Sequence, residues 1–167
     1  MSENAVLNEN SSTQRQIDLL HKVMENNLMP GFEVRQFPVQ HKFTPGLYLR
    51  EVFMPADSRI ISKIHKTEHP FFVLQGKAEV FTEEGGVEVI EAPYVGITKP
   101  GTRRVLRILE DCVWITTHPT SIQPENESSE AIEKAVSLVE EQIIQKHEPA
   151  LTVEELKQLD NLKHLNE

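Results

Sequence analysis

Hydrophobic residues recur along this chain at two different spacings. In the N-terminal region apolar residues are separated by three or four positions, which predicts one face of an amphipathic helix. The segment Ser11-Ser12-Thr13-Gln14 precedes them with capping-box spacing, so we expect a helix from about Ser12 to Asn27 and a loose segment over residues 1–10. The apolar positions of this helix are Ile17, Leu20, Met24 and Leu28.

From Phe32 onwards the pattern changes to short β-prone runs separated by Gly, Pro or acidic residues. Short strands at this spacing are typical of a β-sandwich or jelly roll. The predicted strands are Leu47–Met54, Arg59–His65, Phe71–Gln75, Ala78–Thr82, Val87–Glu91, Tyr94–Thr98, Arg103–Leu109 and Cys112–Thr117.

The last two predicted strands are separated by Glu110-Asp111. A tight two-residue turn at that point makes them a hairpin, and it decides which side chains share a face. In this pairing Arg104, Leu106, Ile108, Val113, Ile115 and Thr117 line the interior. Outward-facing positions are Arg103, Arg107, Trp114 and His118, beneath an arm or against a partner, although His118 can still turn inward at the strand end.

Beyond His118 the helical spacing returns. Apolar residues spaced for a helix follow a polar linker, Glu148-Pro149 ends this segment, and a second capping box at Thr152-Val153-Glu154-Glu155 opens a final helix. We expect both arms to pack on the barrel or on a second subunit. The predicted organisation is residues 1–40 as N-terminal tail and helix, 41–120 as barrel, and 121–167 as C-terminal helical arm. The apolar positions of the first of these helices are Ile132, Val136, Val139 and Ile143.

Composition narrows the class of protein. The 167 residues are 38% hydrophobic without an apolar run of membrane-spanning length, so we expect a cytoplasmic protein that does not enter a membrane. The net charge of −9 opposes binding to nucleic-acid polymers and anionic membranes. Cys112 is the only cysteine, which excludes an intramolecular disulfide and a CxxC metal site, and its apolar surroundings predict a buried thiol.

Two segments contain residues able to bind ions. The first is Lys63-Ile64-His65-Lys66-Thr67-Glu68-His69, which is followed by Gly76. The second is Lys99-Pro100-Gly101-Thr102-Arg103-Arg104. The first resembles the first cupin motif, in which two histidines one residue apart precede a glutamate and then a glycine that turns a hairpin. The second segment resembles the Pro-x-Gly turn of the second cupin motif.

In this alignment His69 takes the glutamate position, His65 the second histidine position and Lys63 the first, while Arg104 stands where the second motif has histidine. The resemblance covers residues 45–118 and implies a mainly β, single cupin jelly-roll barrel with helical arms at both ends. Arginine is a permanently charged donor, so it can hold a carboxylate or phosphate but is not an ordinary metal ligand.

A narrower resemblance concerns the run from His65 to Gly76, Glu110-Asp111-Cys112-Val113-Trp114 and Thr117-His118-Pro119-Thr120. These segments are similar to small uncharacterised cupins encoded by tailed bacteriophages. This resemblance implies His65, His69 and His118 as the ligand set of a divalent transition metal such as Fe, Mn, Ni or Zn. It also implies the host cytoplasm as the location of the protein.

Three functions follow as hypotheses. The favoured one is a binding module that holds a small anion, a nucleotide or carboxylate, through Lys63, His65, His69 and Arg104, because both departures from the cupin pattern introduce cations. The second is a metal-dependent enzyme of oxygenase or isomerase type that uses His65, His69 and His118. The third is a structural or assembly protein. The apolar arms and an outward Trp114 also predict a homo-oligomer.

Overall fold

The computed structural model describes residues 3–26, 28, 36–82, 86–147, 152–155, 157, 158 and 161, and for residues 3–12 it describes the backbone alone. The elements in chain order are α1 (Glu3–Glu25), β1 (Val39–Thr44), β2 (Leu47–Met54), β3 (Arg59–Ile61), β4 (Ile64–His65), β5 (His69–Thr82), β6 (Val87–Glu91), β7 (Tyr94–Thr98), β8 (Arg104–Pro119), α2 (Ser129–Ile143) and β9 (Ile144–Gln145).

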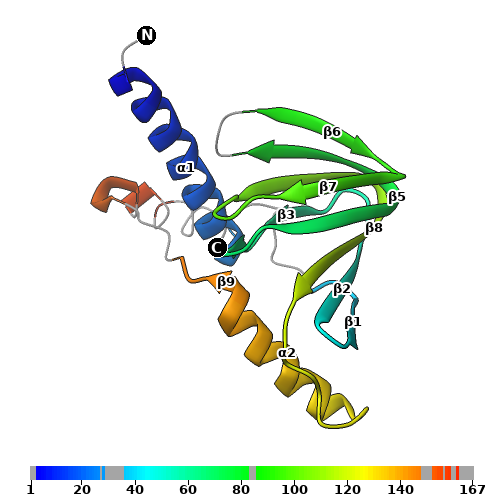
Figure 1. Ribbon diagram of the computed structural model, residues 1–167. Helices are drawn as coiled ribbons and strands as arrows, with labels where there is room; N and C mark the ends of the chain where they lie inside the picture. The colour runs from blue at the N-terminus through cyan, green and yellow to red at the C-terminus, as the bar shows by residue number, and fades with distance from the viewer. Residues whose placement is uncertain are drawn as a thin grey trace.

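The strands pair antiparallel in one large sheet and one small one. The large sheet has the order β1-β2-β8-β5-β6, with β3 also paired to β8 and β7 to β5, while β4 and β9 pair with each other. In Figure 1 the strands are stacked on the right, α1 (blue) lies to their left and α2 (orange) below. The predicted mainly β fold with helices at both ends is confirmed, and it is consistent with a cupin jelly roll.

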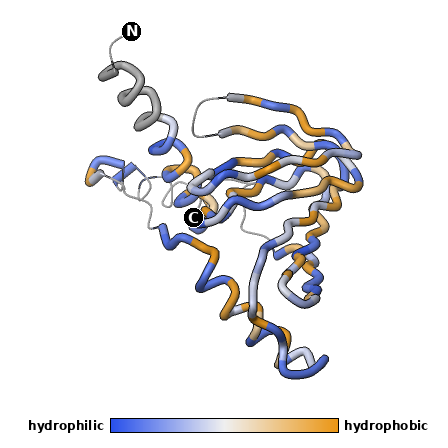
Figure 2. The backbone as a smooth tube through the Cα atoms, in the orientation of Figure 1, coloured by the Kyte–Doolittle hydropathy of each residue, from blue (hydrophilic) through white to orange (hydrophobic). Residues whose placement is uncertain are grey.

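The core of the sheet follows from the pleat, which points alternate side chains inward. Figure 2 shows hydrophobic and hydrophilic positions alternating along the strands. Cys112 is buried in this core as a free thiol, as predicted. The buried members of the core are Val52, Met54, Phe71, Val73, Ala78, Val80, Ile90, Leu106, Ile108, Cys112 and Trp114.

The predicted break at Gly76 is wrong, because β5 runs through it as one strand. Its register against β8 shifts between Val73 and Ala78, and Gly76 lies in this irregular stretch with φ of +89°. An added Cβ at Gly76 would lie 2.2 Å from the backbone oxygen of Asp111. The glycine therefore allows two long strands to stay paired through a bulge, where hairpin geometry was expected.

The predicted hairpin at Glu110-Asp111 is also wrong, because β8 is continuous from Arg104 to Pro119. The strand keeps partners on both sides of this point: Glu110 pairs with Lys77 and Cys112 with Met54. A two-residue turn needs positive φ, which neither residue adopts. Trp114 and His118, which were predicted to face outward, are buried, whereas Val113 and Ile115 lie on the other face and are only partly buried. Thr117, which was predicted to face inward, is buried as well.

Strand boundaries elsewhere differ in smaller ways. β2, β6 and β7 have the predicted bounds, whereas the segment 59–65 forms two short strands that pair with different partners. β1 and β9 were not predicted. The division of the chain at residues 40 and 120 stays a prediction.

The C-terminal arm packs on the barrel of its own chain. The Ser128 hydroxyl caps α2 by accepting a hydrogen bond from the backbone of Ala131 at 3.2 Å, and Val139 and Ile143 pack against Tyr48. The second capping box is confirmed, since Thr152 and Glu155 exchange hydrogen bonds of 2.7 to 3.3 Å. No helix in the described part of the chain is long and apolar enough to cross a bilayer.

The N-terminal helix begins at Glu3, so the expectation of a loose segment over residues 1–10 is wrong for the described residues 3–10. A Ser-Ser-Thr sequence can cap a helix, but it is also tolerated inside one, so the capping signal did not fix the start. The helix ends at Glu25, and Asn27, its predicted end, lies outside the described residues.

An ion pair joins α1 to the barrel. Arg103 Nη1 donates to Asp18 Oδ1 at 2.5 Å, and both side chains are at least 95% buried. His147 Nε2 lies 2.9 Å from the same carboxylate oxygen. Burial raises the pKa of Asp18, but the hydrogen bonds with Arg103 and His147 outweigh it and hold that pKa below its usual value. Arg103 therefore lies beneath an arm and is not solvated, whereas Arg107 is exposed as predicted.

We predict that Gly76→Ala lowers the free energy of unfolding by about 3 kcal/mol or more, because it combines strained φ with a backbone clash. Gly46→Ala is the matched control. Gly46 has φ of +80° and nothing within 4 Å of an added Cβ, so we expect a loss of only about 1–2 kcal/mol. Urea denaturation measures both, and equal losses would contradict the close approach of β5 and β8.

We also predict that Arg103→Ala lowers the free energy of unfolding by about 3–5 kcal/mol, because it leaves the Asp18 carboxylate buried without its partner. Arg107→Ala, which removes a half-exposed arginine from β8, the strand that begins directly after Arg103, should cost about 0–1 kcal/mol. Thermal and urea denaturation of the two variants provide the measurement. Similar stabilities would mean that α1 is not anchored by this pair.

Candidate metal and anion site

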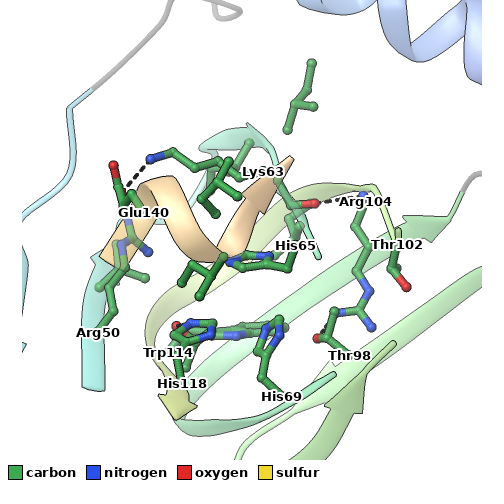
Figure 3. A pocket seen from close by; sticks show the side chains of 18 of the residues that line it. Arg50, Lys63, His65, His69, Thr98, Thr102, Arg104, Trp114, His118 and Glu140 are labelled. Carbon is green, nitrogen blue, oxygen red and sulfur yellow. Dashed lines mark hydrogen bonds and ion pairs between the residues drawn. The ribbon is translucent and has the colours of Figure 1, made fainter. Parts of the chain in front are cut away.

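Three histidines from three strands meet in the interior of the barrel. His65 is on β4, His69 begins β5 and His118 lies near the end of β8. One nitrogen from each ring lies within 4.8 Å of the others, and the ring centroids are 4.4 to 5.1 Å apart. Figure 3 shows the three rings facing one another. His69 and His118 are 2% and 1% exposed, so two of the three are almost fully withdrawn from water.

Strand pairing explains why these positions meet. Phe71 on β5 pairs with Thr116 on β8, and this antiparallel register, extended by two residues, brings His69 opposite His118, whose ring centroids are 4.4 Å apart. His65 is held from outside the large sheet. Its backbone pairs with Ile144 of β9, and its carbonyl accepts a hydrogen bond of 2.9 Å from the amide of Gly101. The Pro-Gly turn identified in the sequence therefore fixes the backbone of a histidine.

Each ring already uses one nitrogen in a hydrogen bond with a nearby group. His69 Nδ1 donates to the carbonyl of Thr67 at 3.1 Å, and a nitrogen of His65 bonds to the backbone of Lys63. His118 Nε2 lies 3.1 Å from the hydroxyl of Thr116, which leaves its Nδ1 buried without a partner. A ring that donates from one nitrogen presents a lone pair on the other, as metal-ligating histidines do.

Burial keeps these rings neutral. Loss of water, with a smaller contribution from the neighbouring imidazoles, lowers the pKa of His65 to about 4 and that of His118 to about 3. Burial also lowers the pKa of His69. Near pH 7 all three are therefore neutral imidazoles, the form that coordinates metal ions. The unpartnered Nδ1 of His118 and the set of three neutral nitrogen donors fit a divalent transition metal.

The histidines border a cavity of about 220 Å³ that Arg104 also lines. Arg104 Nη1 donates to the Thr98 hydroxyl at 3.0 Å, and its guanidinium carbon lies 5.2 Å from the centroid of the Phe71 ring. Burial lowers the pKa of Arg104, which nevertheless remains a cation because arginine is not deprotonated in proteins. The predicted convergence of His65, His69 and Arg104 around one cavity is confirmed.

Lys63 borders the same cavity, but its ammonium group is already paired. Lys63 Nζ lies 2.8 Å from Glu140 Oε1 on α2, and the lysine side chain is more than half exposed. The dashed line in Figure 3 marks this contact. Lys63 and Arg104 both stand where the cupin motifs have histidine. Of these two cations, only Arg104 lines the cavity without an ion pair to a carboxylate.

The sequence analysis missed Arg50. On β2 the inward positions alternate, and Arg50 lies between the buried Tyr48 and Val52, with its side chain lining the cavity. No ion pair or hydrogen bond engages it within the described residues. The alternation of residues along β2 could have predicted this position, because an arginine among inward-facing residues needs an ion-pair partner or a ligand.

Apolar side chains from β2 and β8 also line the cavity. Val52 and Met54 come from β2, and Leu106 and Trp114 from β8. All four belong to the buried core of the barrel. A ligand that enters this cavity thus meets hydrocarbon as well as arginines and the histidine cluster.

No protein-family model matches the sequence, and no curated protein matches it at a significant level. Among solved structures, the chain is similar to a putative ethanolamine utilization protein of Salmonella typhimurium, with 11% identity, 52% of this chain and 72% of that chain covered, and a TM-score of 0.45.

A second similar structure is an RmlC-like cupin family protein of Methanocaldococcus jannaschii with a double-stranded β-helix fold, at 6% identity over 52% of this chain and 83% of that chain, with a TM-score of 0.43. A third is a cupin-2 domain containing protein of Shewanella frigidimarina, at 12% identity over 61% of this chain and 99% of that chain, also with a TM-score of 0.43. These likenesses are distant, and the function proposed below is based on the side chains of the cavity.

Proposed function

We propose that this chain is a metal-dependent enzyme of the cupin type, in which His65, His69 and His118 hold a divalent transition metal and Arg104 binds an anionic group of a small substrate. The observation that carries the proposal is the meeting of three neutral imidazoles with an unpartnered Nδ1 on His118. A buried polar atom without a partner is unfavourable, so it calls for a group that completes the site.

This proposal favours the metal site over an anion module that uses the histidines. Two of them have pKa values of about 4 and about 3, so they bring no positive charge to an anion near pH 7. Lys63 is paired with Glu140 at 2.8 Å. A purely structural role for the barrel does not explain why a histidine cluster and an arginine line one interior cavity.

The protein's own residues have separable roles in the proposed site. The hydrogen bond from Arg104 to Thr98 orients the guanidinium, which can then form charge-assisted hydrogen bonds with a carboxylate or phosphate. The apolar wall that includes Leu106 and Trp114 excludes water from one side of the ligand. The hydrogen bond from His69 Nδ1 to the Thr67 carbonyl leaves Nε2 as the donor atom toward a metal.

The three histidines fit a first-row transition-metal ion such as Fe, Mn, Ni or Zn, because imidazole nitrogen is a suitable ligand for these metals. When bound, such an ion supplies Lewis acidity, and iron or manganese also supplies redox chemistry. The homo-oligomer, the cytoplasmic location and the phage-encoded relatives stay predictions. The homo-oligomer was predicted partly from an outward-facing Trp114, and this part of the argument fails because Trp114 is buried in the core.

We predict that the purified chain binds about one transition-metal ion per chain, and that His118→Ala and His69→Ala each lose most of it, because each removes one of three ligands. His21→Ala is the control, since His21 is on α1 and outside the cavity. Elemental analysis after dialysis against limiting metal provides the measurement, and circular dichroism checks that the variants fold. A wild-type chain without bound metal, or equal metal content in all three variants, would contradict the proposal.

A further inference from the structure

The cavity carries more positive charge than its own residues balance. Its charged lining residues are Arg50, Lys63, Arg104 and Glu140, three cations and one carboxylate, so the formal charge is +2 when the histidines are neutral. The chain as a whole has a formal charge of −9. A cationic interior in an acidic protein indicates a ligand with negative charge, and the surplus indicates two charges on that ligand.

The two arginines of the cavity differ from the other arginines whose ion pairs the structure describes. Arg103 is paired with Asp18, Arg107 with Glu79 and Arg15 with Glu155. Arg50 and Arg104 have no carboxylate within ion-pair distance among the described residues, and the hydrogen bond of the Arg104 guanidinium is to the neutral hydroxyl of Thr98. A guanidinium that is partly withdrawn from water and forms no ion pair with a carboxylate can receive an anionic ligand.

These two arginines lie on opposite sides of the histidine cluster. Figure 3 shows Arg50, from β2, on one side of the three rings and Arg104, at the start of β8, on the other.

The same cavity also has an apolar lining. Val52 and Met54 from β2 and Leu106 and Trp114 from β8 line the same cavity. The volume of about 220 Å³ is below the roughly 300–1,000 Å³ of sites for drug-sized ligands. A nucleotide concentrates its negative charges at one end, whereas this cavity has arginines on opposite sides of the histidine cluster and apolar residues in its lining.

We propose that the ligand is a small dicarboxylate, with one carboxylate on Arg104, the other on Arg50, and a short hydrocarbon stem against Trp114. This inference rests on the proposed function in one respect, which is that the ligand lies beside a bound metal. It makes Arg50 a second specificity-determining residue, because Arg50 distinguishes a dicarboxylate from a monocarboxylate of the same length.

The test is calorimetry on the full chain, once metal-free after chelation and once loaded with zinc, with malonate, succinate, glutarate, adipate and the monocarboxylate butyrate as ligands. We expect at least one dicarboxylate to bind the metal-free chain tenfold or more tighter than butyrate. Arg50→Ala and Arg104→Ala should each weaken that dicarboxylate about 10- to 100-fold, as for loss of a hydrogen bond to a charged group. Arg50→Ala should change butyrate binding less than threefold.

Arg107→Ala is the matched control, because it removes the same charge from a surface position and should change affinity less than threefold. Arg50→Lys keeps the charge and should recover part of the affinity, which separates charge recognition from misfolding. Dicarboxylates that bind no tighter than butyrate, or equal losses in Arg50→Ala and Arg107→Ala, would overturn the inference.

The two proposals can fail separately. Metal bound by the wild-type chain together with no preference for dicarboxylates would overturn the dicarboxylate inference and leave the metal site intact. A dicarboxylate preference in the metal-free chain with no zinc bound under the loading conditions would overturn the metal site and leave Arg50 and Arg104 as the anion receptor.

Discussion

The burial of three neutral imidazoles where β4, β5 and β8 meet is the constraint on which the rest of the site depends. Water is withdrawn from His69 and His118 almost completely, so their ring nitrogens need protein hydrogen bonds or a ligand. Thr67 and Thr116 satisfy one nitrogen of each ring. The backbone of Gly101 and strand β9 hold His65 above them. The helical arm that carries β9 therefore helps to position the proposed metal site, because β9 pairs with the strand of His65.

A second constraint is the balance of charge around that cluster. A divalent ion placed between Arg50 and Arg104 adds to a cavity that already has a surplus of positive charge, and an anionic ligand offsets it. Metal and anion are therefore expected to favour each other's binding, and by linkage the effect is reciprocal. The ion pair between Lys63 and Glu140 has no net charge, so it links α2 to the site without changing the surplus of positive charge in the cavity.

The sequence predicted the mainly β fold, the arms and the convergence of His65, His69 and Arg104, because periodicity and motif spacing are local signals. It did not predict that β5 and β8 are continuous, since strands of 14 and 16 residues depend on partners on both sides. Because a turn was wrongly predicted at Glu110-Asp111, Trp114 and His118 were assigned to the wrong face of the sheet. The Asp18 to Arg103 pair joins residues 85 positions apart, and nothing local indicates it.

The most direct test of the central claim is nitrogen-15 NMR of the imidazole rings in metal-free protein. We expect neutral rings at pH 7, with the proton of His69 on Nδ1, because the Thr67 carbonyl can only accept. For His118 we expect the proton on Nε2, beside the Thr116 hydroxyl, because a metal would need the lone pair of the unpartnered Nδ1. We also expect His65 and His118 to become protonated only near pH 4 and pH 3. Rings that are protonated at pH 7, or protons on the opposite nitrogens, would contradict a preformed three-histidine metal site.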